Sequence, residues 1–354
     1  MEHEIAGAAF RAAPSGTAAA GRRKKERGPR AKGSRKALEK GMGLLFFVCG
    51  MIAVAFVLVI SIYLVISGLP AIVEIGPINF LFGTRWYAST GDFGILAIIL
   101  TSFAGTAGAI IVGVPIGLMT AIFLAKVAPP KVAAVIHTAV ELLAGIPSVV
   151  YGLVGMILLV PAIRVAFDLS SGATLLAAII VLAVMILPSI ISVSETALQA
   201  VPKEYEEASL ALGATHIETV FRVSVPAARS GIATAIVLGI GRAIGEAMAI
   251  IMVAGNVANM PGLLKSVRFL TTAIVSEMSY ASVGSLHRNA LFSIGLVLFL
   301  FIMMINVFLN VFIKQKRRTE PWRTNPSPPD GASMTGGYGC CCTCAASSPA
   351  PCWC

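Results

Sequence analysis

Six long apolar stretches constrain the fold of this chain more than any other feature. Each is longer than the about 20 residues that a helix needs to cross a bilayer, where every backbone polar group must be bonded within its segment. The stretches cover about 44–67, 94–125, 133–162, 174–198, 230–257 and 290–313. Hydrophobic residues make up 57% of the chain and charged residues only 12%, which excludes an ordinary soluble domain. The sequence therefore predicts an all-α integral membrane protein with six transmembrane helices.

The formal net charge of +10 belongs to the two ends of the chain. Residues 1–40 hold 11 Lys and Arg against 4 Asp and Glu, and residues 314–354 hold 5 against 2. Residues 41–313 are therefore neutral overall, with 11 residues of each sign. Because basic flanks stay in the cytoplasm, both termini are predicted to be cytoplasmic, in agreement with an even number of spans. The charge indicates topology and contact with anionic lipid, and it excludes nucleic acid as the main partner.

Three regions follow from these patterns. Residues 1–40 are predicted to be a disordered basic tail, and residues 41–313 form the six-span domain, whose largest cytoplasmic loop is 199–229. Residues 314–354 form a Pro- and Cys-rich cytoplasmic tail that holds six of the seven cysteines. Their spacing is not that of a zinc site, so no metal and no function are expected there.

Two charged residues lie inside the fifth apolar stretch. A charge near the bilayer centre costs about 2.5 to 3.5 kcal/mol on insertion scales, so Arg242 and Glu246 are expected to face a bundle interior or a cavity. Their spacing of four residues predicts that they share one helical face. They either neutralise each other at a helix interface, or they act on a transported ion. In the second case the Arg242 guanidinium donates paired hydrogen bonds to a passing oxyanion, and Glu246 holds or releases Arg242 as the pathway opens.

Pro147 and Ser148 lie inside the third apolar stretch and have two interpretations. They open a local break whose freed backbone groups line a transport path, or Pro147 simply kinks the helix. Together with Arg242 and Glu246, they are the candidate residues of a substrate path. The chain lacks the glycine-rich phosphate loop that ends in Gly-Lys-Ser or Gly-Lys-Thr, so it does not hydrolyse ATP by that route.

The cytoplasmic loop 199–229 is predicted to contain a short amphipathic helix that begins after Pro202. Tyr205, Ala208 and Leu212 fall on one stripe of this helix, and Gly213 is suited to end it in a left-handed cap. Pro226 closes the unit before the next span. The loop therefore offers a rigid helical surface to the cytoplasm.

This loop resembles the Glu-Ala-Ala loop of ABC importer permeases, in which a glycine follows after three residues and an Ile-x-Leu-Pro segment after nine more. The residues that carry the resemblance are Glu207, Ala208, Ser209, Gly213, Val223 and Pro226. Ser209 replaces the second Ala, and Val223 and Val225 replace Ile and Leu. Further stretches, 141–152 and 241–249 among them, resemble the PstC type of phosphate-importer permease. The resemblance covers about residues 44–313 and excludes both tails.

The resemblance implies a type I importer architecture, in which the loop is the coupling helix that docks on an ATPase subunit. It further implies a sister phosphate permease, two ATPase subunits that bind ATP and Mg, an extracytoplasmic phosphate-binding protein, and a bacterial inner-membrane location. No cofactor is expected in this chain. Two alternatives stay open: a permease for another oxyanion such as molybdate or sulfate, and a secondary carrier that uses Glu246 as a proton site.

Overall fold

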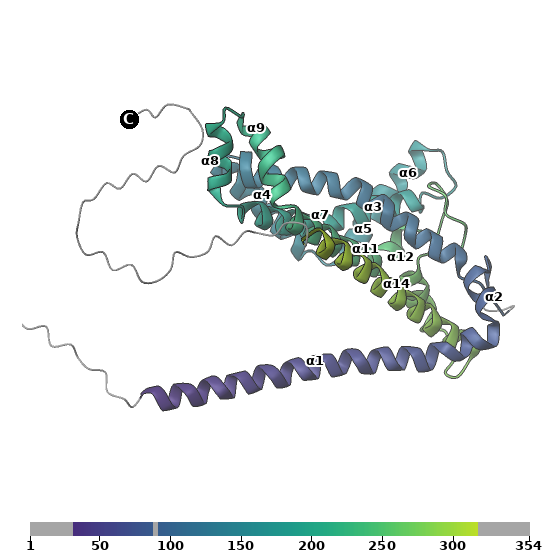
Figure 1. Ribbon diagram of the computed structural model, residues 1–354. Coiled ribbons are helices and arrows are strands. Elements are labelled where there is room, and N and C mark those ends of the chain that lie inside the picture. The colour runs from purple at the N-terminus through teal and green to yellow at the C-terminus, as the bar shows by residue number, and fades with distance from the viewer. Residues whose placement is uncertain (1–30, 88–90, 318–354) are drawn as a thin grey trace, which may run out of the picture.

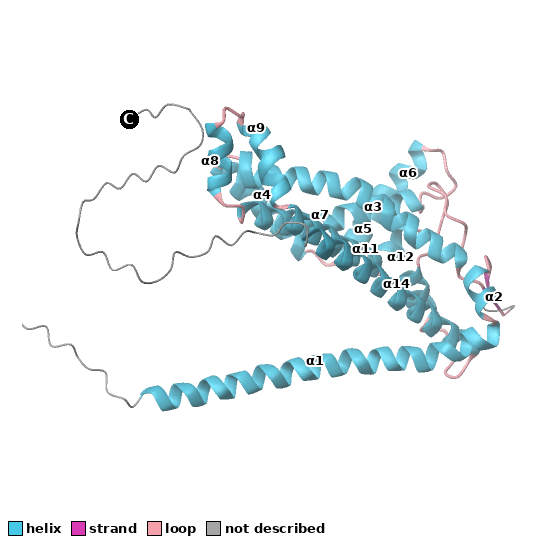
Figure 2. Ribbon diagram, in the orientation of Figure 1, coloured by secondary structure: helices cyan, strands magenta, loops and turns pink. Residues whose placement is uncertain are grey.

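The computed structural model describes residues 31–87 and 91–317, and these form an almost entirely helical protein (Figure 2). The α-helices are α1 (Ala31–Ile75), α2 (Pro77–Phe82), α3 (Leu96–Ile122), α4 (Pro130–Gly145), α5 (Ser148–Val154), α6 (Val160–Ala166), α7 (Leu175–Gln199), α8 (Lys203–Ala211), α9 (His216–Thr219), α10 (Val225–Ala227), α11 (Arg229–Gly245), α12 (Met248–Val253), α13 (Leu270–Glu277) and α14 (Leu286–Arg317). Three π-helical segments are η1 (Phe123–Val127), η2 (Gly155–Leu159) and η3 (Val220–Ser224). A two-residue antiparallel hairpin pairs β1 (Trp86–Tyr87) with β2 (Asp92–Phe93).

The centre of the bundle is α7, which packs between α3 and α11. Glycines make this packing close. A Cβ atom on Gly113 or Gly117 of α3 would lie 2.8 or 2.9 Å from Ile186 or Ile190 of α7, and one on Gly239 of α11 would lie 3.1 Å from Ile190. Small residues let helix backbones approach in a membrane, where the hydrophobic effect does not drive helices together. The three helices thus form a closely packed unit at the centre of the fold.

Helix α1 stands apart from this bundle (Figure 1). Residues 39–60 are exposed throughout, although nearly all of them are apolar. The helix meets α14 only towards its own C-terminal end, where the Ser293 hydroxyl donates to the Gly68 carbonyl oxygen over 2.6 Å and Tyr63 contacts Phe292 edge-on. The molecule therefore has two ends: the α2 end, where α1 joins the bundle, and the α8 end, which carries α8 and α9 (Figure 1).

The predicted all-α membrane architecture is confirmed, with five to six candidate spans against the six predicted. Among the described residues, five helices are long and apolar enough to cross a membrane. A sixth span is reached if His216–Ala227 and Arg229–Gly245, which meet at 70°, count as one bent unit. Residues 31–40 form the first turns of α1, so the predicted disorder is wrong for them, because Ala, Lys, Arg and Leu favour helix. The rest of that tail and residues 318–354, with the Cys-rich end, lie outside the described residues.

Two predicted spans are interrupted. The stretch 133–162 divides at Ile146–Pro147, and the apolar spanning segment is 148–166, preceded by α4, in which no residue is buried. The stretch 230–257 divides at Glu246–Ala247 between α11 and α12. Proline explains the first break, because Pro147 cannot donate to the helix and restricts the residue before it.

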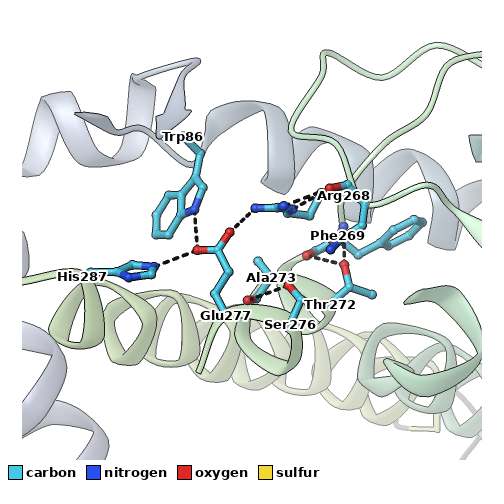
Figure 3. Close-up of polar contacts among 9 residues, drawn as sticks. Trp86, Arg268, Phe269, Thr272, Ala273, Ser276, Glu277 and His287 are labelled. Atoms are coloured by element: carbon cyan, nitrogen blue, oxygen red, sulfur yellow. Dashed lines mark hydrogen bonds and ion pairs between the residues drawn. The ribbon is translucent and has the colours of Figure 1, made fainter. Parts of the chain in front are cut away.

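A polar cluster joins four segments at the α2 end (Figure 3). The Glu277 carboxylate accepts from Trp86 Nε1 over 2.9 Å, lies 2.8 Å from His287 Nε2, and forms an ion pair with Arg268. Arg268 also donates to the Asn256 carbonyl oxygen through Nε and Nη2. The hairpin, the loop before α13, α13 itself and α14 are therefore held together by one carboxylate.

Acid is expected to loosen this cluster. Burial alone would raise the pKa of Glu277, but hydrogen bonds from His287 and Trp86 and the charge of Arg268 lower it below its ordinary value of 4.5. A carboxylate with a lowered native pKa contributes stability that is present above about pH 4.5 and is lost as the pH falls through the lower native value. Thermal unfolding in detergent should therefore show a melting temperature that falls below pH 4.5 less steeply for Glu277→Gln than for the wild type. Equal pH dependence of the two proteins would contradict this.

Candidate functional site

The first helix break places Pro147 and Ser148 at the start of α5. α4 ends at Gly145, and Ile146 and Pro147 are extended, with ψ of 126° and 141°. The Leu143 carbonyl oxygen beside this break accepts from the Ile146 N–H over 3.3 Å and from the Tyr151 hydroxyl over 2.7 Å. The structure thus has a break rather than a simple kink, and a side chain of the next helix bonds to the end of α4.

The second helix break lies at Glu246. This residue has φ −72° and ψ 130°, so it follows α11 as extended backbone. Its carboxylate accepts from the Ala249 N–H over 3.1 Å, and its own carbonyl oxygen accepts from the Thr271 hydroxyl over 2.7 Å. Side-chain oxygens bonded to the first N–H groups of a helix stabilise its start, so Glu246 caps α12. The break contains no proline. It is stabilised by the hydrogen bond from Thr271, which lies in α13.

The two breaks lie close together, although about 100 residues separate them in the sequence. α5 and α12 begin directly after them and pack against each other. A Cβ atom on Gly152 of α5 would lie 2.8 Å from the Cα atom of Ala249 in α12. Such an approach requires glycine. The fold therefore brings the two breaks together: Pro147 and Glu246 lie in non-helical backbone, Ser148 begins α5, and Arg242 lies in the last turn of α11.

Arg242 lies in the last turn of α11 and is exposed. Its guanidinium donates to the Ser189 hydroxyl over 3.3 Å, and within the described residues this is its only hydrogen bond or ion pair. The prediction that Arg242 and Glu246 share a helical face is wrong, because α11 ends at Gly245 and the expected spacing is lost. Glu246 is engaged in capping, which leaves most of the Arg242 donors available.

The loop 199–229 contains the predicted short helix and the predicted glycine end. α8 begins after Pro202, and Gly213 follows it with a φ of +86°, in the left-handed region that favours glycine. A capping box between Thr215 and Glu218 then starts α9. The loop is therefore a compact pair of short helices at the α8 end (Figure 1).

The surface of α8 differs from the amphipathic prediction. Tyr205 and Ala208 are exposed, and Leu212 is 90% exposed, so the apolar stripe faces outward. The half-buried residues are Glu206 and Ser209, and the Ser209 and Thr219 hydroxyls lie 2.9 Å apart. Polar contacts, rather than apolar burial, attach this helix to the protein. Of the remaining motif residues, Glu207, Gly213 and Pro226 are exposed and Val223 is half-buried.

Sequence patterns missed the residue that attaches α8. Glu206 forms an ion pair with Lys126 over 2.5 Å and accepts a hydrogen bond from the Ser224 hydroxyl over 2.8 Å. Burial would raise the pKa of Glu206, but these bonds lower it. The one available signal was a charge pattern: Lys126 ends a long apolar stretch, and Glu206 directly precedes the motif.

Across residues 31–87 and 91–317, no three His, Cys, Asp or Glu side chains gather in a way that would hold a metal ion. The candidate site has two parts: the exposed guanidinium of Arg242 near the helix breaks, and the helical loop at the α8 end. The first arrangement can bind an anion, and the second can receive another protein.

Comparison with known proteins places this arrangement in a family. Residues 113–318 match the family described as binding-protein-dependent transport system inner membrane component. The chain is 42% identical over 266 residues to the probable ABC transporter permease protein YqgH of Bacillus subtilis, which covers 73% of this chain and 86% of that protein. It is 34% identical over 281 residues to the phosphate transport system permease protein PstC of Haemophilus influenzae, covering 74% and 88%.

The fold agrees with these relatives. A chain of a bacterial alginate ABC transporter, solved in complex with an alginate-pentasaccharide-bound periplasmic protein, superposes with a TM-score of 0.58 at 16% identity and covers 79% of this chain and 98% of that one. The resemblance to permeases of the PstC type is confirmed. It does not favour the proton-coupled carrier. The family match covers more than half of the sequence, and the chain therefore belongs to the binding-protein-dependent inner membrane components, as a multi-pass permease of an ABC importer.

Proposed function

We propose that this permease imports inorganic phosphate and forms half of the transmembrane path. The observation that carries the proposal is Arg242: an exposed guanidinium whose only described partner is the neutral Ser189 hydroxyl. A guanidinium presents paired donors that match the oxygens of a phosphate. A cation within a span is costly, so a position beside two helix breaks is best explained by a function on the path.

The residues around Arg242 support the same role. Pro147, Ser148 and Glu246 belong to the breaks, and non-helical backbone at membrane depth is tolerated where it is buried in protein or lines a water-filled cavity. Glu246 follows Arg242 by four residues and is not bonded to it. We propose that the Glu246 side chain keeps anion binding weak enough for the ion to leave the site.

Exposed surfaces of the protein provide a place for each of the partners that we propose for the importer. A sister phosphate permease covers the apolar surface of α1 over residues 39–60, and lipid covers the rest. Two ATPase subunits receive α8 and its equivalent, with the contact made around Glu207, Ala208, Ser209 and Gly213 and supported by Val223 and Pro226. ATP and Mg are bound in those subunits. An extracytoplasmic phosphate-binding protein delivers the ion at the α2 end.

The proposed orientation places both termini in the cytoplasm of a bacterial cell, with the protein in the inner membrane. The basic residues before α1 and after α14 support this, as does the direction of the two helices: α1 starts and α14 ends towards the α8 end (Figure 1). The cycle is alternating access, in which closure of the ATPase subunits moves α8 and the two permeases rock around the path.

The proposal is tested with the complete importer reconstituted in vesicles with its binding protein. We expect uptake of radiolabelled phosphate that requires ATP and the binding protein and survives collapse of the proton gradient. An excess of unlabelled sulfate or molybdate should leave uptake unchanged, whereas unlabelled phosphate should abolish it. Uptake of molybdate or sulfate in preference to phosphate would contradict the substrate. The chemistry of Arg242 alone fits that alternative equally well, because a guanidinium does not distinguish among oxyanions.

A further inference from the structure

One carboxylate on α8 contacts the ends of two membrane spans. Glu206 binds Lys126, which lies in η1 at the end of α3, and Ser224, which lies in η3 and leads through α10 into α11. The two partners lie 80 residues before Glu206 and 18 residues after it. α11 carries Arg242 in its last turn, so the chain that runs from Ser224 to the candidate anion site is helical on both sides of a 70° bend between α10 and α11.

The junction is shielded from water. The side chains of Lys126 and Glu206 are 10% and 19% exposed, and Ser224 is fully buried. Charges that are partly withdrawn from solvent interact more strongly and are screened less by salt than exposed pairs. His216 Nε2 adds a contact of 3.0 Å to the Lys126 carbonyl oxygen, so α9 is attached to the same point of η1.

The other attachments of α8 are weak by comparison. No residue of α8 is buried, and its apolar side chains, including Tyr205 and Leu210, face outward. The junction also ends on two π-helical segments, which are short local departures from α-helix and occur frequently at functional sites. Besides the backbone that joins α8 to α7 and the contact between Ser209 and Thr219, a force applied to the outer face of α8 therefore reaches α3 and α11 through Glu206.

We propose that Lys126, Glu206 and Ser224 are positioning residues that transmit the movement of α8 to α3 and α11 during transport. This rests on the proposed function, because it takes α8 to be the surface moved by the ATPase subunit. The ion pair pulls α3, and the hydrogen bond pulls α11, so both spans move with α8. When the ion pair is absent, α8 still docks and the ATPase still turns over, but the spans no longer follow.

The test measures ATP hydrolysed per phosphate transported, in reconstituted complexes carrying Glu206→Gln. Glutamine keeps an oxygen for Ser224 but removes the charge that binds Lys126. We expect ATP hydrolysis within about twofold of the wild type and phosphate uptake at least about tenfold lower, so the ratio rises about tenfold. Lys131→Met is the matched control, since Lys131 is an exposed lysine five residues after Lys126, and it should keep the wild-type ratio.

A charge exchange provides the second arm. Lys126→Glu combined with Glu206→Lys rebuilds the pair with reversed polarity and is expected to bring the ratio back to within about threefold of the wild type, as interaction energies in double-mutant cycles allow. An unchanged ratio in Glu206→Gln, or hydrolysis and uptake falling in proportion, would overturn the proposal. So would a charge exchange that assembles and hydrolyses ATP but leaves the ratio raised.

Two further measurements keep the result interpretable. If neither variant assembles with the ATPase, Ser224→Ala decides, because it removes one hydrogen bond and keeps the ion pair: a raised ratio supports the link and a wild-type ratio refutes it. Wild-type uptake of phosphate, sulfate and molybdate is measured first. If the wild type carries another of these anions, the phosphate assignment fails, and the ratio is then determined with that anion.

Discussion

Arg242→Gln is expected to lower phosphate uptake by roughly 10- to 100-fold in a complex that assembles normally. A hydrogen bond to a charged group contributes about 1.5 to 3 kcal/mol, and each 1.4 kcal/mol corresponds to about a factor of ten. Glutamine keeps a donor near Ser189 but loses the charge and the paired N–H groups. Uptake of labelled phosphate is measured per assembled complex, with the amount of co-purified ATPase as the measure of assembly.

Three controls separate binding of an ion from support of the fold. Arg242→Lys keeps the positive charge but lacks the paired N–H donors of the guanidinium, and it should lose less uptake than the glutamine variant. Ser189→Ala removes the described partner of Arg242 and should leave uptake within about threefold of the wild type, because a single neutral hydrogen bond contributes only about 1 kcal/mol. Arg164→Gln removes an exposed arginine of α6 and should have no effect. Wild-type uptake by an assembled Arg242→Gln complex would remove Arg242 from the path.

Gly213→Val is the second change with a large expected effect, a loss of uptake of roughly 5- to 30-fold. Gly213 has a φ of +86°, and an L-residue in the left-handed region costs about 1 to 2 kcal/mol, with β-branched residues the least suited. A Cβ atom at this position would meet nothing within 4 Å, so crowding is not the cause. The backbone would instead relax and turn α8 relative to α9, which misplaces the surface offered to the ATPase.

Gly213→Asn is the matched variant, because asparagine adopts the left-handed region far more readily than valine. It should retain most of the uptake although its side chain is as large as that of valine. ATP hydrolysis stimulated by the binding protein is measured beside uptake, and membrane insertion is followed by the yield of the chain. Equal losses in the two variants would indicate that side-chain size, and not the backbone conformation, matters at this position.

The parts of the fold that depend on local sequence could be predicted. Runs of apolar residues long enough to cross a bilayer predict spans wherever they occur, and a glycine after a short helix predicts a left-handed cap. The break at Pro147 was one of two open interpretations, because proline both kinks and interrupts helices. The exposure of Leu212 could not be predicted, since an apolar stripe indicates only that some surface will cover it.

The parts that depend on distant contacts could not be predicted. The sequence from Gly245 to Met248 contains no proline, and the break there is held by Thr271, which lies 25 residues further along. Arg242 and Glu246 have the spacing of a helical pair, and only the end of α11 separates them. Trp86 reaches Glu277 across 191 residues, a pairing that no periodicity encodes.

The contact between Gly68 and Ser293 can form only late in the synthesis of this protein. It joins the first membrane helix to the last, across 225 residues. At roughly 5 to 20 residues per second, synthesis of that interval takes roughly 10 to 45 s. During this time α1 has no α14 to meet, so its apolar length must be stable in lipid as a single helix. The extended run of exposed apolar residues in α1 meets this need, and the same surface is available to a neighbouring subunit before the chain is complete.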